Sequence, residues 1–187
     1  MDKLSRTLFA ASLAALATGV SALAQHGQQP YAGQEKRALK ALSEAEIADL
    51  LAGRGMGLAK AAELNGYPGP AHLLENAAAL NLSDDQRRAI EAIRARMAAA
   101  AEALGREILA RERELDAAFA EARIDAAELR AKTDAIAALM GRLRAVHLAA
   151  HIEARPLLTA AQIADYNKLR GYAGSGEPQQ HHPRRHH

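Results

Sequence analysis

Two long stretches of helix-forming sequence, 84–121 and 126–154, are separated by only a few residues around Arg123. In both stretches apolar side chains recur mostly three, four or seven positions apart, as on one face of an α-helix. The first apolar stripe consists of Ile90, Ile93, Met97, Leu104, Ile108, Leu115 and Phe119. The second consists of Leu129, Ile136, Leu139, Leu143, Val146 and Ala150, and Pro156 opposes its continuation. A short connection turns the chain back, so the pair predicts an antiparallel helical hairpin.

One short phrase occurs three times along the chain, as ALSEAEIADL at 41–50, NLSDDQRRAI at 81–90 and LLTAAQIADY at 157–166. Each copy places a serine or threonine three residues before a glutamate or glutamine. This is the capping box, in which two side chains satisfy the free amides at a helix start. The cap residues are Ser43, Ser83 and Thr159, and their partners are Glu46, Gln86 and Gln162. The second and third phrases lie at similar distances from Arg123 on either side, so we expect them at the same end of the hairpin.

The remaining segments predict short helices and no strands, because strand-type alternation is absent and helix formers dominate. One helix begins at Ser43, is interrupted at 53–57 (GRGMG), and resumes to about Asn65. A turn at 66–70 (GYPGP) precedes a helix from Pro70 to about Ala79, and a last helix covers 160–170. The expected fold is therefore all-α: a long hairpin with short flanking helices that begin at capping boxes.

Composition excludes several classes of protein. The chain has 187 residues, no cysteine, 3% aromatic residues and a formal net charge of +2. Disulfides are therefore impossible, and the even charge balance argues against a nucleic-acid-binding protein. No cysteine nucleophile, GxSxG motif or phosphate-binding loop is present, and the Asp84–Asp85 pair is explained by its place at a helix start. We expect no enzymatic activity and no required cofactor.

The N-terminus has the pattern of a secretory signal peptide. Lys3 and Arg6 precede a weakly apolar run, and small residues at 22–24 (ALA) suit cleavage after Ala24. The alternative is an uncleaved membrane anchor, because a run of about 17 residues is near the lower limit for spanning a bilayer. After cleavage we expect no stable membrane insertion. The predicted organisation is a signal peptide at 1–24, a flexible leader at 25–41, a helical domain at 42–172 and a disordered tail at 173–187.

The motifs LSDDQ at 82–86 and LTAAQ at 158–162, flanking a helical hairpin in an exported chain, resemble the LTxxQ family of bacterial periplasmic proteins. The block from GRGMG to LSDDQ is similar to that of the Spy/CpxP-like and heavy-metal-sensor-like members. The resemblance covers about 42–172 and implies a cradle-shaped, non-enzymatic, periplasmic homodimer. Spy-type members bind unfolding proteins without ATP, and metal-type members bind zinc, nickel, cobalt or copper. The resemblance assigns structural roles to Leu82, Ser83, Gln86, Leu158, Thr159 and Gln162.

The strongest candidate metal ligands are His147 and His151, which are four residues apart on the second long helix. At that spacing two imidazoles lie about 6 Å apart on one face and can hold one ion. The alternative is two solvated histidines. Met97 is expected opposite the pair and also fits the core, while His72 and Glu63 are further possible ligands. In the tail, four histidines can bind zinc, nickel or copper weakly: His181, His182, His186 and His187.

A basic surface is the alternative functional feature. Arginines gather near the capped end of the hairpin, and the candidates for contact with unfolded proteins are Arg87, Arg88, Arg94, Arg142 and Arg144. Mixed basic and apolar surface attracts a polypeptide through charge and holds it by apolar contact, although an ordinary solvated helix face has the same pattern. A third possibility, a regulator that binds a partner of an envelope signalling system, has no distinguishing residue pattern.

Overall fold

The computed structural model describes residues 29–172, in which helices account for all regular secondary structure. The predicted signal peptide, residues 25–28 of the predicted leader and the histidine-rich tail lie outside the described residues. Residues 29–32 form a turn in a separate unit, in which the amide of Ala32 donates to the carbonyl of Gln29 at 2.9 Å. Residues 33–172 belong to the other unit, which contains all of the helices between 29 and 172. Within 29–172, we find no helix with the length and apolar character needed to cross a membrane.

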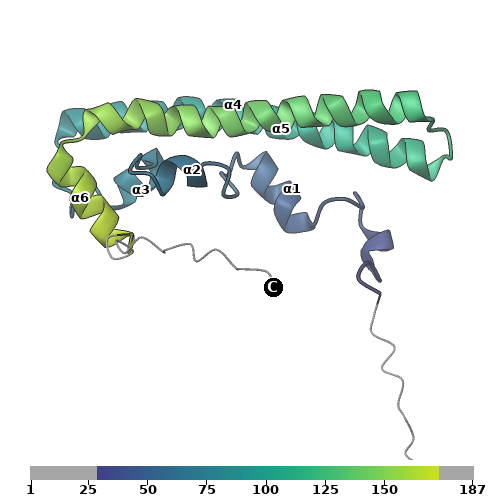
Figure 1. Ribbon diagram of the computed structural model, residues 1–187, viewed down its shortest axis with the longest axis horizontal. Coiled ribbons are helices and arrows are strands. Elements are labelled where there is room, and N and C mark those ends of the chain that lie inside the picture. The colour runs from purple at the N-terminus through teal and green to yellow at the C-terminus, as the bar shows by residue number, and fades with distance from the viewer. Residues whose placement is uncertain (1–28, 173–187) are drawn as a thin grey trace, which may run out of the picture. The chain divides into compact units, whose positions relative to one another are not determined.

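The predicted hairpin is confirmed. Helix α4 (Asp84–Ala120) and helix α5 (Ala126–Ala154) run alongside each other over most of their length (Figure 1). Between them the chain reverses at Ala122, whose φ of 51° is left-handed. The carboxylate of Asp125 then accepts hydrogen bonds from the amides of Ala127 and Glu128 at 2.9 and 2.8 Å, which starts α5. The turn therefore depends on local hydrogen bonds that the sequence encodes directly.

Short helices pack along one side of the hairpin (Figure 1). In chain order they are α1 (Glu44–Leu51), α2 (Lys60–Glu63) and α3 (Pro70–Glu75), and the 3₁₀-helix η1 (Gln34–Lys36) precedes them. After α5 come the 3₁₀-helix η2 (Arg155–Leu157) and α6 (Ala160–Leu169), which turns away from the hairpin axis. All three predicted capping boxes are present, with both hydrogen bonds of each box made. The all-α architecture follows from these helix starts.

Two predicted helices are shorter than expected. After α1 the chain is helical again only over the four residues of α2. Gly53, Met56 and Gly57 adopt left-handed backbone angles that interrupt the helix before it. Helix α3 ends at Glu75 rather than Ala79. There the side-chain amide of Asn76 donates to the carbonyl of His72 at 2.8 Å, and the chain continues in turns to the left-handed Asn81. Both differences arise where glycine or asparagine changes the backbone direction.

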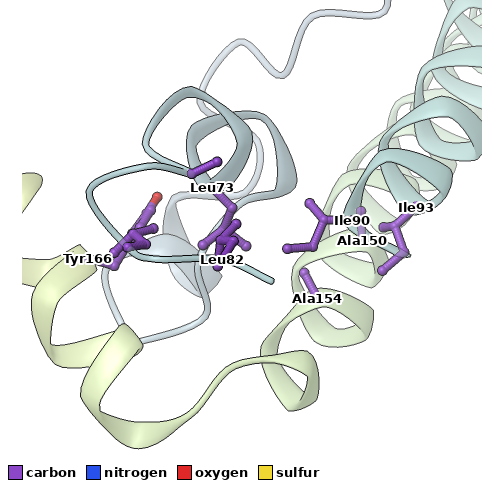
Figure 2. Packing of buried hydrophobic residues seen from close by; sticks show 9 residues of the cluster. Leu73, Leu82, Ile90, Ile93, Ala150, Ala154 and Tyr166 are labelled. Atoms are coloured by element: carbon purple, nitrogen blue, oxygen red, sulfur yellow. The ribbon is translucent and has the colours of Figure 1, made fainter. Parts of the chain in front are cut away.

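The core consists of two apolar clusters on the hairpin. One joins α3, the residues after it, α4, α5 and α6 (Figure 2), and its fully buried members include Leu73, Ile90, Ala154 and Tyr166. The other joins α1 to the middle of α4 and α5. Two members of the predicted stripes, Phe119 and Leu129, are exposed. The short helices end before the turn of the hairpin and leave both side chains uncovered (Figure 1).

Helix α1 lies against α4 at Gly105. A Cβ atom built there overlaps the carbonyl oxygen of Leu50, and it would lie 2.7 Å from the carbonyl carbon of the same residue. Both contacts are to main-chain atoms at the end of α1, which cannot rotate out of the way. Glycine at this position therefore allows the two helices to pack with their backbones in contact.

The two glutamines of the LTxxQ-type motifs join the second and third capping boxes. The amide nitrogen of Gln86 donates to the side-chain oxygen of Gln162 at 2.9 Å and to the carbonyl of Leu157 at 2.7 Å. The amide nitrogen of Gln162 donates in return to the oxygen of Gln86 at 3.1 Å. Each glutamine therefore completes its own capping box and also bonds to the other motif. This confirms that the two motifs lie at the same end of the hairpin.

Exchanging Gln86 for glutamate tests this bridge. Glutamate keeps the oxygen that accepts from the Ser83 amide and from Gln162 but cannot donate to Leu157 or Gln162, so it removes two of the three hydrogen bonds of the bridge and leaves the box. We expect Gln86→Glu to lower the free energy of unfolding by about 1–3 kcal/mol, because partly buried acceptors lose their donors. Ser83→Ala, which removes only the cap, is expected to lower it by about 1 kcal/mol. Urea denaturation of both variants measures the difference, and equal losses would contradict the bridge.

Candidate functional site

Glu63, the last residue of α2, is a buried carboxylate at the centre of a polar cluster. Its Oε1 accepts a hydrogen bond from the hydroxyl of Tyr166 and another, at 3.2 Å, from that of Tyr172. Its Oε2 accepts from the amide of Gly69 at 3.1 Å, and Nε of Arg170 lies 3.5 Å from Oε1. We call these five residues the Glu63 clasp. The clasp joins the α2–α3 segment to α6 and to the chain that follows it.

The charge and proton distribution of the clasp follows from its partners. Burial, followed by the hydrogen bond to Glu63, raises the pKa of the Tyr166 phenol above its ordinary value. The hydroxyl therefore keeps its proton and remains a donor to the carboxylate. Arg170 supplies a positive charge on the same side of the site. The buried carboxylate thus has the donors and the counter-charge that burial requires.

His151 lies beside the clasp on α5, and its tautomer can be assigned from its partner. Its Nδ1 is 2.7 Å from the carbonyl oxygen of Tyr67 and 3.7 Å from Oε2 of Glu63. A carbonyl only accepts, so Nδ1 carries the proton and Nε2 of the neutral ring carries a lone pair. Gly69 lies against the other edge of this ring, where a Cβ would be 2.9 Å from Cε1 and 3.1 Å from Nε2.

His147 lies one turn earlier on the same helix and is the more deeply buried of the pair. Its exposed fraction is 3%, against 8% for His151, so the alternative of two solvated histidines is wrong. The irregular segment around Gly55 and the α2–α3 segment cover this face of α5: a Cβ on Gly55 would lie 3.7 Å from Nδ1 of His147. Nε2 of His147 is buried without a hydrogen-bond partner among the described residues.

Burial gives His147 a predictable effect on stability. Burial, with a smaller contribution from His151, lowers the pKa of His147 in the folded state. The unfolded chain then binds a proton near the ordinary pKa of about 6.5, at a pH where the folded state does not. The free energy of unfolding therefore falls as pH drops below about 6.5, down to the folded pKa. We expect His147→Leu to be more stable than the parent at pH 5 by a larger margin than at pH 8. Urea denaturation at both pH values tests this, and equal margins would contradict it.

A cavity of about 530 Å³ lies between the α1–α3 segments and the hairpin. Its apolar wall comes mainly from small residues and methionines, and its polar wall includes four of the predicted ligand candidates. Those four are Glu63, His72, His147 and His151, and Met97 lines the same cavity as predicted. Met97 also packs against the apolar cluster at this end of the hairpin.

Most of the candidate ligands for a metal ion around the cavity already have hydrogen-bond or ion-pair partners in the protein. Over residues 29–172, no three histidine, aspartate or glutamate side chains are grouped so that they could hold one. The Glu63 oxygens already accept hydrogen bonds, Nδ1 of His151 is bonded to Tyr67, and Nδ1 of His72 lies 3.4 Å from Glu63. The four tail histidines (His181, His182, His186 and His187) lie outside the described residues. The described side chains therefore form a hydrogen-bonded cluster beside the cavity.

The predicted arginine candidates are all exposed. Arg94 lines the cavity, Arg88 pairs with Asp85 on the first turn of α4, and Arg87, Arg142 and Arg144 extend into solvent. Arg155 lies at the end of α5; its guanidinium is 4.8 Å from the centre of the Tyr67 ring and its Nε donates to the carbonyl of Gly66 at 3.1 Å.

Sequence reasoning missed the two tyrosines of the clasp. The repeated phrase contained a sign of Tyr166, because the final positions of the three copies are Leu50, Ile90 and Tyr166. All three are buried, so a tyrosine in this place needs a buried hydrogen-bond partner. Tyr172 comes after the last helix and had no comparable pattern.

These features define an all-α helical-hairpin protein whose two motif glutamines close one end of the hairpin. A sequence model described as LTXXQ motif family protein matches residues 72–170, more than half of the chain. The chain belongs to the LTXXQ motif family, as the two motifs predicted. No curated protein and no solved structure matches it.

Proposed function

We propose that this protein is a periplasmic envelope-stress protein of the Spy/CpxP type, which binds partly unfolded proteins without ATP and has no enzymatic activity. The proposal rests on an exposed apolar and basic surface beside the Glu63 clasp. Leu64 and Ile152 are 61% and 62% exposed, and Tyr67 is exposed under the guanidinium of Arg155. We call these four residues the Tyr67 surface.

The Tyr67 surface has the physical properties that reversible binding of an unfolded chain needs. Ile152 and Arg155 are three residues apart, so they share a face at the end of α5. Leu64 and Tyr67 lie two residues before and one residue after Gly66, whose carbonyl accepts a hydrogen bond from the same arginine. Isolated apolar residues are common on protein surfaces, but large ones grouped beside a cation suit a polypeptide partner. The cation attracts the partner, and apolar contact then holds it.

Location and assembly are part of the proposal. Membership of the LTXXQ family and the signal-peptide pattern before Ala24 support a periplasmic location. A homodimer is supported by the exposed Phe119 and Leu129 at the turn of the hairpin, since a second copy could cover them. Sedimentation equilibrium of the mature chain tests the dimer, and the double variant Phe119→Ser, Leu129→Ser tests this surface.

Aggregation of a chemically denatured model enzyme tests client binding. Without ATP, the mature chain at near-equimolar concentration is expected to suppress the light scattering that occurs on dilution from denaturant. The variant Leu64→Ser, Ile152→Ser is expected to lose most of this effect, whereas Leu169→Ser, an exposed leucine on α6, is expected to keep it. Absence of suppression by the parent chain at a several-fold excess would refute the proposal.

Metal binding is the second candidate function, because Glu63, His72, His147 and His151 all line one cavity. Calorimetric titration of the mature chain with zinc, nickel, cobalt and copper, with and without the residues after Gly171, tests it. Tight stoichiometric binding lost in His147→Ala, His151→Ala would favour a metal sensor. Binding lost only with the tail would assign the metal to the tail histidines.

A further inference from the structure

We propose that the cavity beside His147 binds one phenol or indole side chain, a tyrosine or tryptophan, from an acidic segment of an unfolded protein. The inference deepens the proposed client binding, on which it rests, by assigning it an anchor site and a side-chain class. The cavity volume of about 530 Å³ lies within the range of about 300–1,000 Å³ that is usual for ligand sites, and it exceeds what one aromatic side chain needs.

The apolar walls of the cavity suit an aromatic ring. The side facing the hairpin is formed by Met97 and Ala98, and the opposite side by Met56 and Pro70. Methionine side chains adapt their shape and make favourable sulfur contacts with aromatic rings. Glycine at positions 55 and 69 keeps the backbone close to the two imidazoles without filling the space in front of them. An aromatic side chain therefore meets apolar surface on two sides.

The two buried histidines favour a bound side chain whose polar group donates a hydrogen bond. Nε2 of His151 carries a lone pair, because Nδ1 of the same ring donates to Tyr67. Nδ1 of His147 faces the backbone at Gly55, where a Cβ would lie 3.7 Å away, and a neutral imidazole always has one nitrogen that accepts. A phenol O–H or an indole N–H supplies the missing donor, whereas a phenylalanine ring leaves the imidazoles unpaired.

The charges at the rim of the cavity favour a particular charge on the residues that flank the aromatic one in the bound segment. Lys60 and Arg94 line it and form no ion pair with any described residue, while Arg54 pairs with Asp49 at 2.5 Å. One exposed carboxylate, that of Glu75, lies on the same rim, and the other, Glu63, is held inside the clasp. The unpaired charges at the entrance are therefore mainly positive, which favours a segment with acidic residues on each side of the aromatic one.

Tryptophan fluorescence provides a direct test, because the chain contains no tryptophan. The probe is acetyl-Asp-Glu-Trp-Glu-Asp-amide, titrated with the mature full-length protein at low salt. Binding is expected as a saturable shift of the indole emission to shorter wavelength. The same peptide with phenylalanine, used as a competitor, is expected to bind about tenfold more weakly or worse, because a site built around polar partners rejects an analogue without them.

Matched variants locate the site. Gly55→Val fills the space in front of His147 and is expected to weaken binding about tenfold or more. Gly141→Val, where a side chain meets open space, is expected to leave binding unchanged. Arg94→Ala is expected to weaken binding about twofold to fivefold, and Arg142→Ala, away from the cavity, to have no effect. His147→Leu is expected to reduce the preference for tryptophan over phenylalanine. Circular dichroism melting confirms that each variant is folded.

The outcomes separate this inference from the proposed function. Suppressed aggregation by the parent chain with no saturable peptide binding would overturn the cavity as anchor and leave the proposed function standing. Peptide binding that Gly55→Val weakens, without suppression of aggregation, would support the cavity and refute the chaperone proposal. Peptide binding that Gly55→Val and Gly141→Val weaken equally would also overturn the inference, because the cavity would not be the site.

Discussion

Glu63→Ala is expected to lower the free energy of unfolding by about 3–5 kcal/mol, which is the usual loss when one partner of a buried charged cluster is removed. The substitution leaves the hydroxyls of Tyr166 and Tyr172 and the amide of Gly69 without their acceptor. It also leaves Arg170 without its counter-charge. Because these groups hold α6 on the α2–α3 segment, the amides of α6 are expected to exchange faster with solvent deuterium.

Two comparisons make the Glu63 result specific. Glu75→Ala removes an exposed carboxylate one helix further along the chain and is expected to change the free energy of unfolding by less than about 0.5 kcal/mol. Glu63→Gln keeps the size of the side chain and one acceptor oxygen, so an intermediate loss is expected. Denaturant unfolding measures all three variants. A loss below about 1 kcal/mol for Glu63→Ala would show that the clasp does not hold α6.

Alanine is expected to have opposite effects at the two glycines inside the hairpin helices. At Gly105 a Cβ overlaps the carbonyl oxygen of Leu50, so α1 must move away from α4, with an expected loss of about 3 kcal/mol. At Gly141 a Cβ meets open space, so Gly141→Ala is expected to gain about 0.5–1 kcal/mol through its better helix propensity.

Thermal and urea unfolding of the two variants measure these changes, and hydrogen exchange of α1 gives an independent readout. Faster exchange confined to α1 and the segment after it is expected for Gly105→Ala. If Gly105→Ala were as stable as the parent, the backbone contact between Leu50 and α4 would not exist in solution. If Gly141→Ala were destabilising, that position would have a contact absent from this structure.

Much of the fold could be predicted because its determinants are local. A capping box acts over three residues and an apolar helical stripe over four, so Ser43, Ser83 and Thr159 marked helix starts correctly. The short turn around Arg123 then required a hairpin. Predictions failed where glycine and asparagine redirect the backbone, at 53–57 and after Asn76, because such residues allow several paths and tertiary contacts select one.

The candidate site could be predicted only in part. Sequence reasoning proposed Glu63, His72, His147 and His151 as possible ligands, and the structure places all four around one cavity. It could not predict that Glu63 bonds to Tyr166, which is 103 positions away in the sequence, since no periodicity relates them. It also could not predict the burial of His147, which depends on how the irregular segment around Gly55 crosses α5.

The sequence by itself determined where helices begin, that the two long ones form a hairpin, and that the two glutamine motifs meet at one end. These features depend on hydrogen bonds and side-chain spacing within one or two helical turns. Only the tertiary structure decided which polar side chains are buried together, where Gly105 admits the backbone of α1, and where the cavity lies. Those properties depend on the packing of short, irregular segments against the hairpin, and their positions are fixed by contacts between residues far apart in the chain.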